Sequence, residues 1–68
     1  MLNWNLWAPD VMQSEGGMFR VYKTQIKDSQ IFRYRLCQLA DGAWLKRGEG
    51  KTFSECAALA DDLEAGAS

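Results

Sequence analysis

The chain contains no histidine, one proline and two cysteines among its 68 residues. Without histidine, the usual base for a serine or cysteine nucleophile and the usual nitrogen ligand of a zinc site are both missing. No Gly-x-Ser-x-Gly turn is present, and the Gly-Lys-Thr run at residues 50–52 lacks the spacing of a phosphate-binding loop. We therefore expect no catalytic residues, no metal ligands and no cofactor, and we predict a non-enzymatic protein.

Long apolar runs are also missing. No stretch approaches the roughly 18 apolar residues that cross a bilayer, and residues 1–4 lack the basic start of a secretory signal. We expect a cytoplasmic protein with no membrane partner. Two cysteines, Cys37 and Cys56, are too few for a secreted disulfide framework. Small buried free thiols are expected, and a Cys37–Cys56 bridge stays open as an alternative for an exported chain.

The length predicts one domain, residues 1–68, which buries only roughly 60% of its unfolded surface. An apolar fraction of 47% is too high for a disordered chain. We therefore expect a folded domain of marginal stability that an interface would reinforce. Both a monomer and a homodimer through an exposed strand edge are compatible with so small a sheet.

Charge is distributed unevenly along the chain. All eight Lys and Arg residues lie between Arg20 and Lys51, and the last sixteen residues carry four carboxylates and no base. The net charge of −1 is therefore the sum of +5 over residues 18–51, −2 before them and −4 after them. This pattern predicts a basic side and an acidic side, each able to attract a partner of opposite charge.

Strands are predicted where apolar and polar residues alternate or β-branched and aromatic residues gather. The predicted strands are residues 18–26, 31–39 and 43–47, with residues 2–7 as a candidate short strand. Asp41-Gly42 predicts a tight hairpin turn, and residues 27–30 form a polar connection. Residues 10–17 show no period and are predicted to be a loop.

A helix is predicted from Phe53 to Gly66. Thr52 and Glu55 have the spacing of a capping box, in which each side chain bonds the backbone of the other residue. Apolar residues then recur at helical spacing: Phe53, Cys56, Ala57, Leu59, Ala60 and Leu63. The predicted fold class is α+β, a three-stranded antiparallel β-meander with one C-terminal helix packed on it and the candidate N-terminal strand.

A basic and aromatic sheet face is the first candidate site. If Phe32, Tyr34 and Leu36 face the helix, with Phe19 and Val21 beside them, strand parity places another set on the opposite face. This set is Arg20, Tyr22, Arg33, Arg35, Trp44 and Lys46. Aromatic rings that stack on bases, interleaved with cations that meet phosphates, suit single-stranded nucleic acid. The alternative is that Trp4 and Trp7 fold across this face and bury Trp44.

An acidic helix edge is the second candidate site, for a macromolecular partner. It consists of Glu55, Asp61, Asp62 and Glu64. The last three lie at the end of the helix where the dipole disfavours negative charge, which favours a role in meeting a basic surface. The alternative is a solvated helix face without function.

Residues 18–65 resemble the second half of a double-stranded RNA-binding domain: three strands, Gly-Glu-Gly-Lys-Thr, and a helix reading Ser-Glu-Cys-Ala-Ala-Leu-Ala-Asp-Asp-Leu. In that family two lysines at the helix start reach across a phosphate-lined groove. The corresponding positions here are Phe53 and Ser54, with Lys51 nearby, and the family's first helix has no counterpart. The resemblance therefore implies the architecture more than binding to RNA.

A looser resemblance concerns size and style. A short chain with a Trp-rich start, a meander and one terminal helix resembles the small accessory proteins of bacteriophages and prophages, including anti-CRISPR inhibitors. The resemblance implies stoichiometric binding to a host protein or nucleoprotein complex. We therefore predict an interaction protein, most concretely an inhibitor of a host defence protein or complex. Nucleic-acid binding through the basic sheet face is the alternative.

Overall fold

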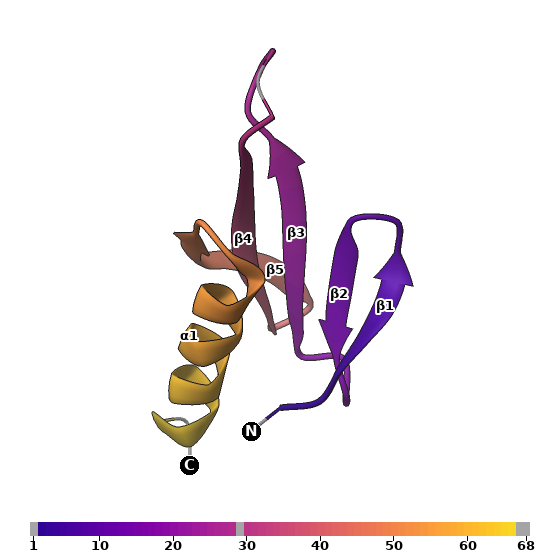
Figure 1. The fold of residues 1–68 in the computed structure, drawn as a ribbon. Coiled ribbons are helices and arrows are strands. Elements are labelled where there is room, and N and C mark those ends of the chain that lie inside the picture. The colour runs from indigo at the N-terminus through magenta and orange to yellow at the C-terminus, as the bar shows by residue number, and fades with distance from the viewer. Residues whose placement is uncertain (1, 29, 67–68) are drawn as a thin grey trace.

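The computed structural model describes residues 2–28 and 30–66 (Figure 1). Met1, Ser29, Ala67 and Ser68 lie outside the described residues, so the predicted connection at 27–30 is described except for Ser29. The elements are β1 (Trp4–Ala8), β2 (Val11–Ser14), β3 (Phe19–Gln25), β4 (Phe32–Ala40), β5 (Ala43–Gly50) and α1 (Phe53–Gly66). The strands form one sheet in the order β1-β2-β3-β4-β5 with antiparallel neighbours, and α1 packs on one face.

The prediction of a three-stranded sheet is wrong, because the sheet has five strands. The candidate strand at residues 2–7 is present as β1, and residues 10–17, predicted to be a loop, contain β2. Proline fixes φ near −65° at Pro9, and Asp10 has a φ of 81°, as in a type II turn. This turn joins β1 to β2 as a hairpin. Since Val11, Met12 and Gln13 are all half-buried, β2 lacks the alternation by which strands are predicted.

The last strand is also longer than predicted. β5 continues through residues 48–50, beyond the predicted end of the strand at residue 47. Its pairing with β4 is interrupted once, because Leu36 pairs with Gly48 whereas Cys37 pairs with Lys46. Arg47 is therefore the extra residue of a β-bulge, which increases the local twist of the strand.

The core lies between α1 and the central strands. Its buried apolar residues are Phe19, Val21, Leu36, Cys56 and Ala60. Leu59, Leu63, Phe53 and Tyr34 are partly buried against them. The predicted apolar stripe of the helix is therefore confirmed, as are the inward positions of β3 and of Tyr34 and Leu36 in β4. Phe32, which was also predicted to face the helix, is instead 39% exposed and lies outside this core. No helix among residues 2–28 and 30–66 has the length and apolar character to cross a membrane.

The β1–β2 hairpin is attached to α1 by two contacts from the N-terminal segment. The Leu2 amide donates a 2.8 Å hydrogen bond to Oδ1 of Asp61. The Trp4 ring meets the Phe53 ring edge-on, with centroids 5.5 Å apart and an angle of 84° between the planes. Aromatic pairs prefer this geometry, and both contacts bring β1 toward the helix.

The predicted capping box is present. The Glu55 amide donates to Oγ1 of Thr52 at 3.2 Å, and the Thr52 amide donates to Oε2 of Glu55 at 3.3 Å. We expect Thr52→Ala to lower the free energy of unfolding by about 0.5–2 kcal/mol, as for other lost N-caps. Urea denaturation would measure this, with Thr52→Ser as the control that keeps the hydroxyl. Equal stability of the alanine variant and the parent would contradict the prediction.

Candidate functional site

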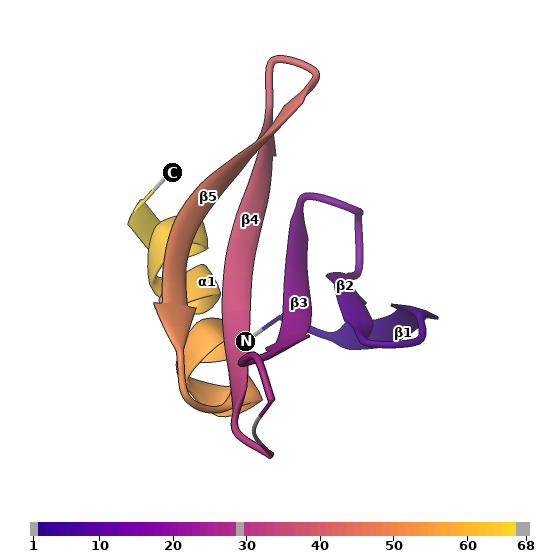
Figure 2. The same ribbon diagram turned by 90° about the horizontal axis from the view of Figure 1, so that it is seen from above.

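Within the described part of the chain, α1 lies against one face of the sheet and leaves the opposite face open to solvent (Figure 2). We call this the open sheet face. The strand register pairs Tyr22 with Arg35, and Cys37 with both Arg20 and Lys46, and these pairs project on the open side. All six residues predicted to share this face lie on it: Arg20, Tyr22, Arg33, Arg35, Trp44 and Lys46. Their binding role stays a prediction.

Arg20 is the centre of the open sheet face. Its guanidinium carbon lies 3.9 Å from the centroid of the Trp7 ring and 4.2 Å from the centroid of the Trp44 ring. Its Nε also donates a 2.8 Å hydrogen bond to Oε1 of Gln13, and Nη1 lies 3.4 Å from the hydroxyl of Tyr22. Cation–π contacts on two rings and these hydrogen bonds fix the orientation of the side chain. We call Trp7, Arg20 and Trp44 the stacked trio.

The sequence did not determine whether Trp4 and Trp7 fold across the open sheet face, and the structure shows where each one lies. Trp4 lies on the helix side of the sheet against Phe53, whereas Trp7, which has the opposite parity in β1, lies on the open face against Arg20. Trp7 is 53% exposed. Thus only one of the two tryptophans lies on the open face, and that face is not buried. Sequence reasoning omitted Trp7 from the site, although alternation in residues 2–7 already separated it from Trp4.

Glu49 is a carboxylate within the basic part of this face. It forms an ion pair with Lys46, and its Oε1 lies 4.0 Å from Nε of Arg35. The hydrogen bond and charge of Lys46 hold the pKa of Glu49 below its usual value, with smaller contributions from Arg35 and Arg33. Glu49 therefore partly neutralises the two nearest cations. Its position could not be predicted, because it depends on the β-bulge in β5.

The four residues of the predicted acidic helix edge do not form one edge. At about 3.6 residues per turn, Glu55 and Asp62 lie along one side of α1, toward β5, where Gly50 approaches Glu55. Asp61 and Glu64 lie on the other side, near Leu2. Glu55 caps the helix and Asp61 binds the Leu2 amide. Of these four residues, only Asp62 and Glu64 are exposed carboxylates without such a structural contact to another described residue.

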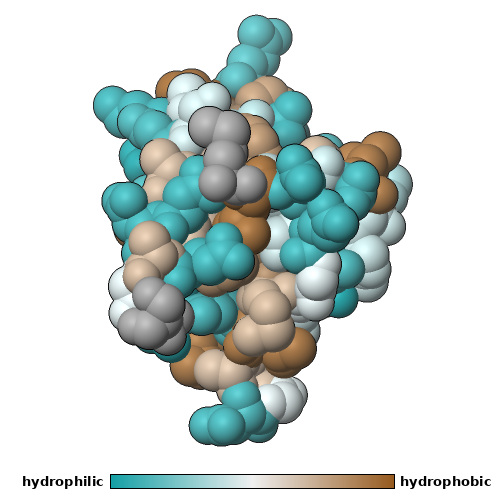
Figure 3. All heavy atoms as spheres, turned by 90° about the horizontal axis from the view of Figure 1, so that it is seen from below, coloured by the Kyte–Doolittle hydropathy of each residue, from teal (hydrophilic) through white to brown (hydrophobic). Residues whose placement is uncertain are grey.

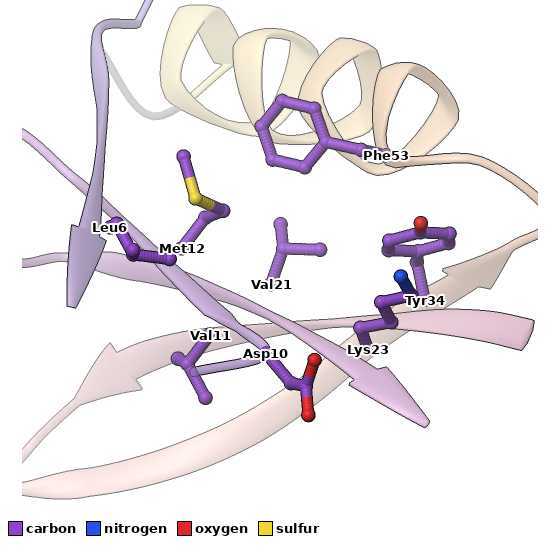
Figure 4. A pocket seen from close by; sticks show the side chains of 8 residues that line it. All are labelled: Leu6, Asp10, Val11, Met12, Val21, Lys23, Tyr34 and Phe53. Carbon is purple, nitrogen blue, oxygen red and sulfur yellow. The ribbon is translucent and has the colours of Figure 1, made fainter. Parts of the chain in front are cut away.

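An apolar groove opens on the helix side, between the β1–β2 hairpin and the start of α1 (Figure 4). Its volume is about 400 Å³, and Leu6 on its rim is 72% exposed. Phe53 extends over it from the helix, and Met12 and Val21 project from the strands. The complete lining is Leu6, Asp10, Val11, Met12, Val21, Lys23, Tyr34 and Phe53. Volumes of this order are typical of binding pockets.

Both cysteines are free thiols and lie on opposite faces of the sheet. Cys56 is buried against the helix side and its Sγ lies 3.3 Å from the carbonyl oxygen of Tyr34. Cys37 is half-buried on the open face, so the bridge considered for an exported chain is not formed. Burial raises the pKa of both thiols, and Arg35 and Lys46 partly oppose this at Cys37. Among the described residues, no three Cys, Asp or Glu side chains gather as a metal site would require.

These features define a small α+β domain with a basic and aromatic sheet face on one side and an apolar groove on the other. No family model matches the chain, and searches of curated proteins and of solved structures give no match.

Proposed function

We propose that the protein is a non-enzymatic binding protein whose open sheet face binds single-stranded nucleic acid. The observation that carries this proposal is the stacked trio, with Tyr22, Arg33, Arg35 and Lys46 on the same exposed face. Every base can stack on an aromatic ring, so stacking carries little sequence preference, while Arg and Lys contact the phosphates. Three adjacent strands present both kinds of group here.

The stacked trio supplies rigidity that such a face requires. Arg20 is held by two rings and by Gln13 before any ligand arrives. Side chains that are already ordered lose less conformational entropy on binding. Trp7 and Trp44 are thereby kept at fixed positions, so a base can stack without first ordering either ring.

Fluorescence anisotropy with labelled single-stranded and duplex DNA and RNA tests the proposal. We expect single strands to bind, with the logarithm of the affinity falling linearly with the logarithm of salt concentration by about 0.7 per phosphate contact. If the protein binds duplexes more tightly than single strands, contacts with a groove or with the phosphate backbone, rather than base stacking, would explain the binding. The absence of binding to every probe at low salt would refute the proposed function.

Glu49→Gln is expected to increase the affinity for single strands. The substitution removes the carboxylate that neutralises Lys46 and Arg35. Because the pKa of Glu49 is lowered, its folded-state charge persists as the pH falls toward about 4.3, the ordinary value for Glu. The gain should therefore persist in mildly acidic buffer. Glu64→Gln makes the same charge change far from the face, and an equal gain there would contradict the prediction.

A protein partner is the second candidate function. The apolar groove beside Phe53 favours it, because such a groove accepts apolar side chains. The more specific expectation, an inhibitor of a host defence protein, stays a prediction.

If the acidic residues bind that partner, Asp62→Lys with Glu64→Lys should abolish its binding while preserving the fold. Asp61 is left unchanged because it anchors Leu2, and undiminished binding would exclude an acidic interface.

A further inference from the structure

The turn between β3 and β4 forms one end of the molecule, and α1 ends at the other (Figure 1). Three large apolar side chains are exposed near this turn: Ile26 and Phe32 partly, and Ile31 by 61%. They surround a hollow of about 460 Å³ that we call the tip hollow. Its lining is Ile26, Ile31, Phe32, Arg33 and Lys51.

The tip hollow is surrounded by positive charge. Arg33 and Lys51 line it, Lys27 lies in the turn, and the Lys23 ammonium lies 4.2 Å from the centroid of the Phe32 ring. Asp28 is the one acid within the described part of this turn. The carboxylates Asp61, Asp62 and Glu64 belong to the last turns of α1, at the opposite end of a molecule 40 Å long.

That opposite end is covered largely by hydrophilic side chains, with apolar ones visible between them (Figure 3). Asp61, Asp62 and Glu64 therefore do not neutralise the cations at the tip hollow, whereas Glu55, at the start of α1, accepts a hydrogen bond from the Lys51 amide and lies close to it. A ligand that combines an apolar group with negative charge would satisfy both properties of the hollow, because four cations lie around it against three acids in the described part of the chain. The cations are Lys23, Lys27, Arg33 and Lys51, and the acids are Asp28, Glu49 and Glu55.

We propose that the tip hollow binds an acidic peptide segment of a partner protein through one large apolar side chain. A hollow accepts a side chain, whereas a lipid surface is entered by a protruding apolar tip. Ile26 and Ile31 are aliphatic and provide no stacking surface for bases, so Phe32 is the one ring among the described residues of this lining. The complementary peptide places Asp or Glu on either side of a Leu, Phe or Trp.

Selection from a display library of short random peptides on the immobilised full chain tests this inference. We expect the enriched peptides to share a large apolar residue flanked by acids. An enriched set without acids, or without the apolar residue, would overturn it. A synthetic copy of the dominant peptide is then titrated against the parent and two variants, Ile31→Ser and Lys51→Gln. Each should weaken binding at least tenfold, and unchanged binding by both would overturn the proposal.

Leu45→Ser is the matched control, because Leu45 is another exposed apolar residue on a strand but lies outside the tip hollow. It should bind the peptide as the parent does. The Lys51 amide donates a hydrogen bond to Glu55, and a substitution of the Lys51 side chain keeps that backbone donor.

Binding of Ile31→Ser to labelled single strands should be unchanged, so failure of the tip-hollow proposal can be distinguished from failure of the proposed function of the open sheet face. Loss of self-association in Ile31→Ser, seen by sedimentation, would instead make a second copy the occupant and overturn the proposal.

Discussion

Replacing Trp44 with alanine is expected to lower the affinity for single-stranded nucleic acid by about 5- to 150-fold, because stacking on one aromatic ring contributes about 1–3 kcal/mol per base. Trp44 also forms one wall of the stacked trio. Without it, the Arg20 guanidinium keeps its contacts with Trp7 and Gln13 but gains freedom on one side. The variant therefore loses a stacking surface and part of the order of its neighbour. Anisotropy with a labelled single strand measures the effect.

The control for this substitution is Leu45→Ala, the next residue along β5, whose side chain projects to the other face of the sheet. It should bind single strands as the parent does. Because Trp44 is half-buried, urea denaturation must show that the alanine variant is folded under the binding conditions. A folded Trp44→Ala protein with unchanged affinity would exclude the stacked trio from the binding surface.

Local patterns predicted the helix and the faces of the long strands. The capping box and apolar stripe of α1 depend on neighbours a few residues apart, so Phe53 was identified as its start and the structure agrees. In β3, buried Phe19 and Val21 alternate with half-buried residues. In β4, buried Leu36 follows exposed Arg35, and the sequence alternates at these positions. β2 escaped prediction because Val11, Met12 and Gln13 are all half-buried, so no alternation marks one face of the strand. Its pairing with β1 and β3, rather than its own pattern, makes it a strand.

The sequence likewise predicted part of the candidate site but not all of it. Parity alone placed six residues on the open sheet face. Trp7 joins them by the parity that residues 2–7 already show, whereas Glu49 joins them only because of the bulge at Arg47. Irregular register depends on how neighbouring strands pair, which a single sequence does not specify. The placement of the four acids on one edge was wrong for another reason, since charge composition does not show which carboxylates already bond the backbone. Their binding role stays a prediction.

Close packing of β5 against the start of α1 leads to the largest expected loss of stability. A Cβ atom added at Gly50 would lie 2.8 Å from Cβ of Glu55 and 2.9 Å from its Oε2. Glu55 is fixed at both points, by the helix backbone and by the capping box. The clash cannot be relieved by rotating a free side chain. Gly50→Ala must therefore displace the strand or break the cap.

We expect Gly50→Ala to lower the free energy of unfolding by about 1–3 kcal/mol for overpacking, and by up to about 2 kcal/mol more where the cap is lost. Each kcal/mol corresponds to a fall in Tm of roughly 4–8 °C for a domain of this size. Gly66→Ala is the matched control, because its added Cβ meets nothing within 4 Å. It should hold or raise the Tm, since alanine favours helix. If Gly50→Ala matched Gly66→Ala in thermal denaturation, β5 and α1 could not be packed this closely in solution.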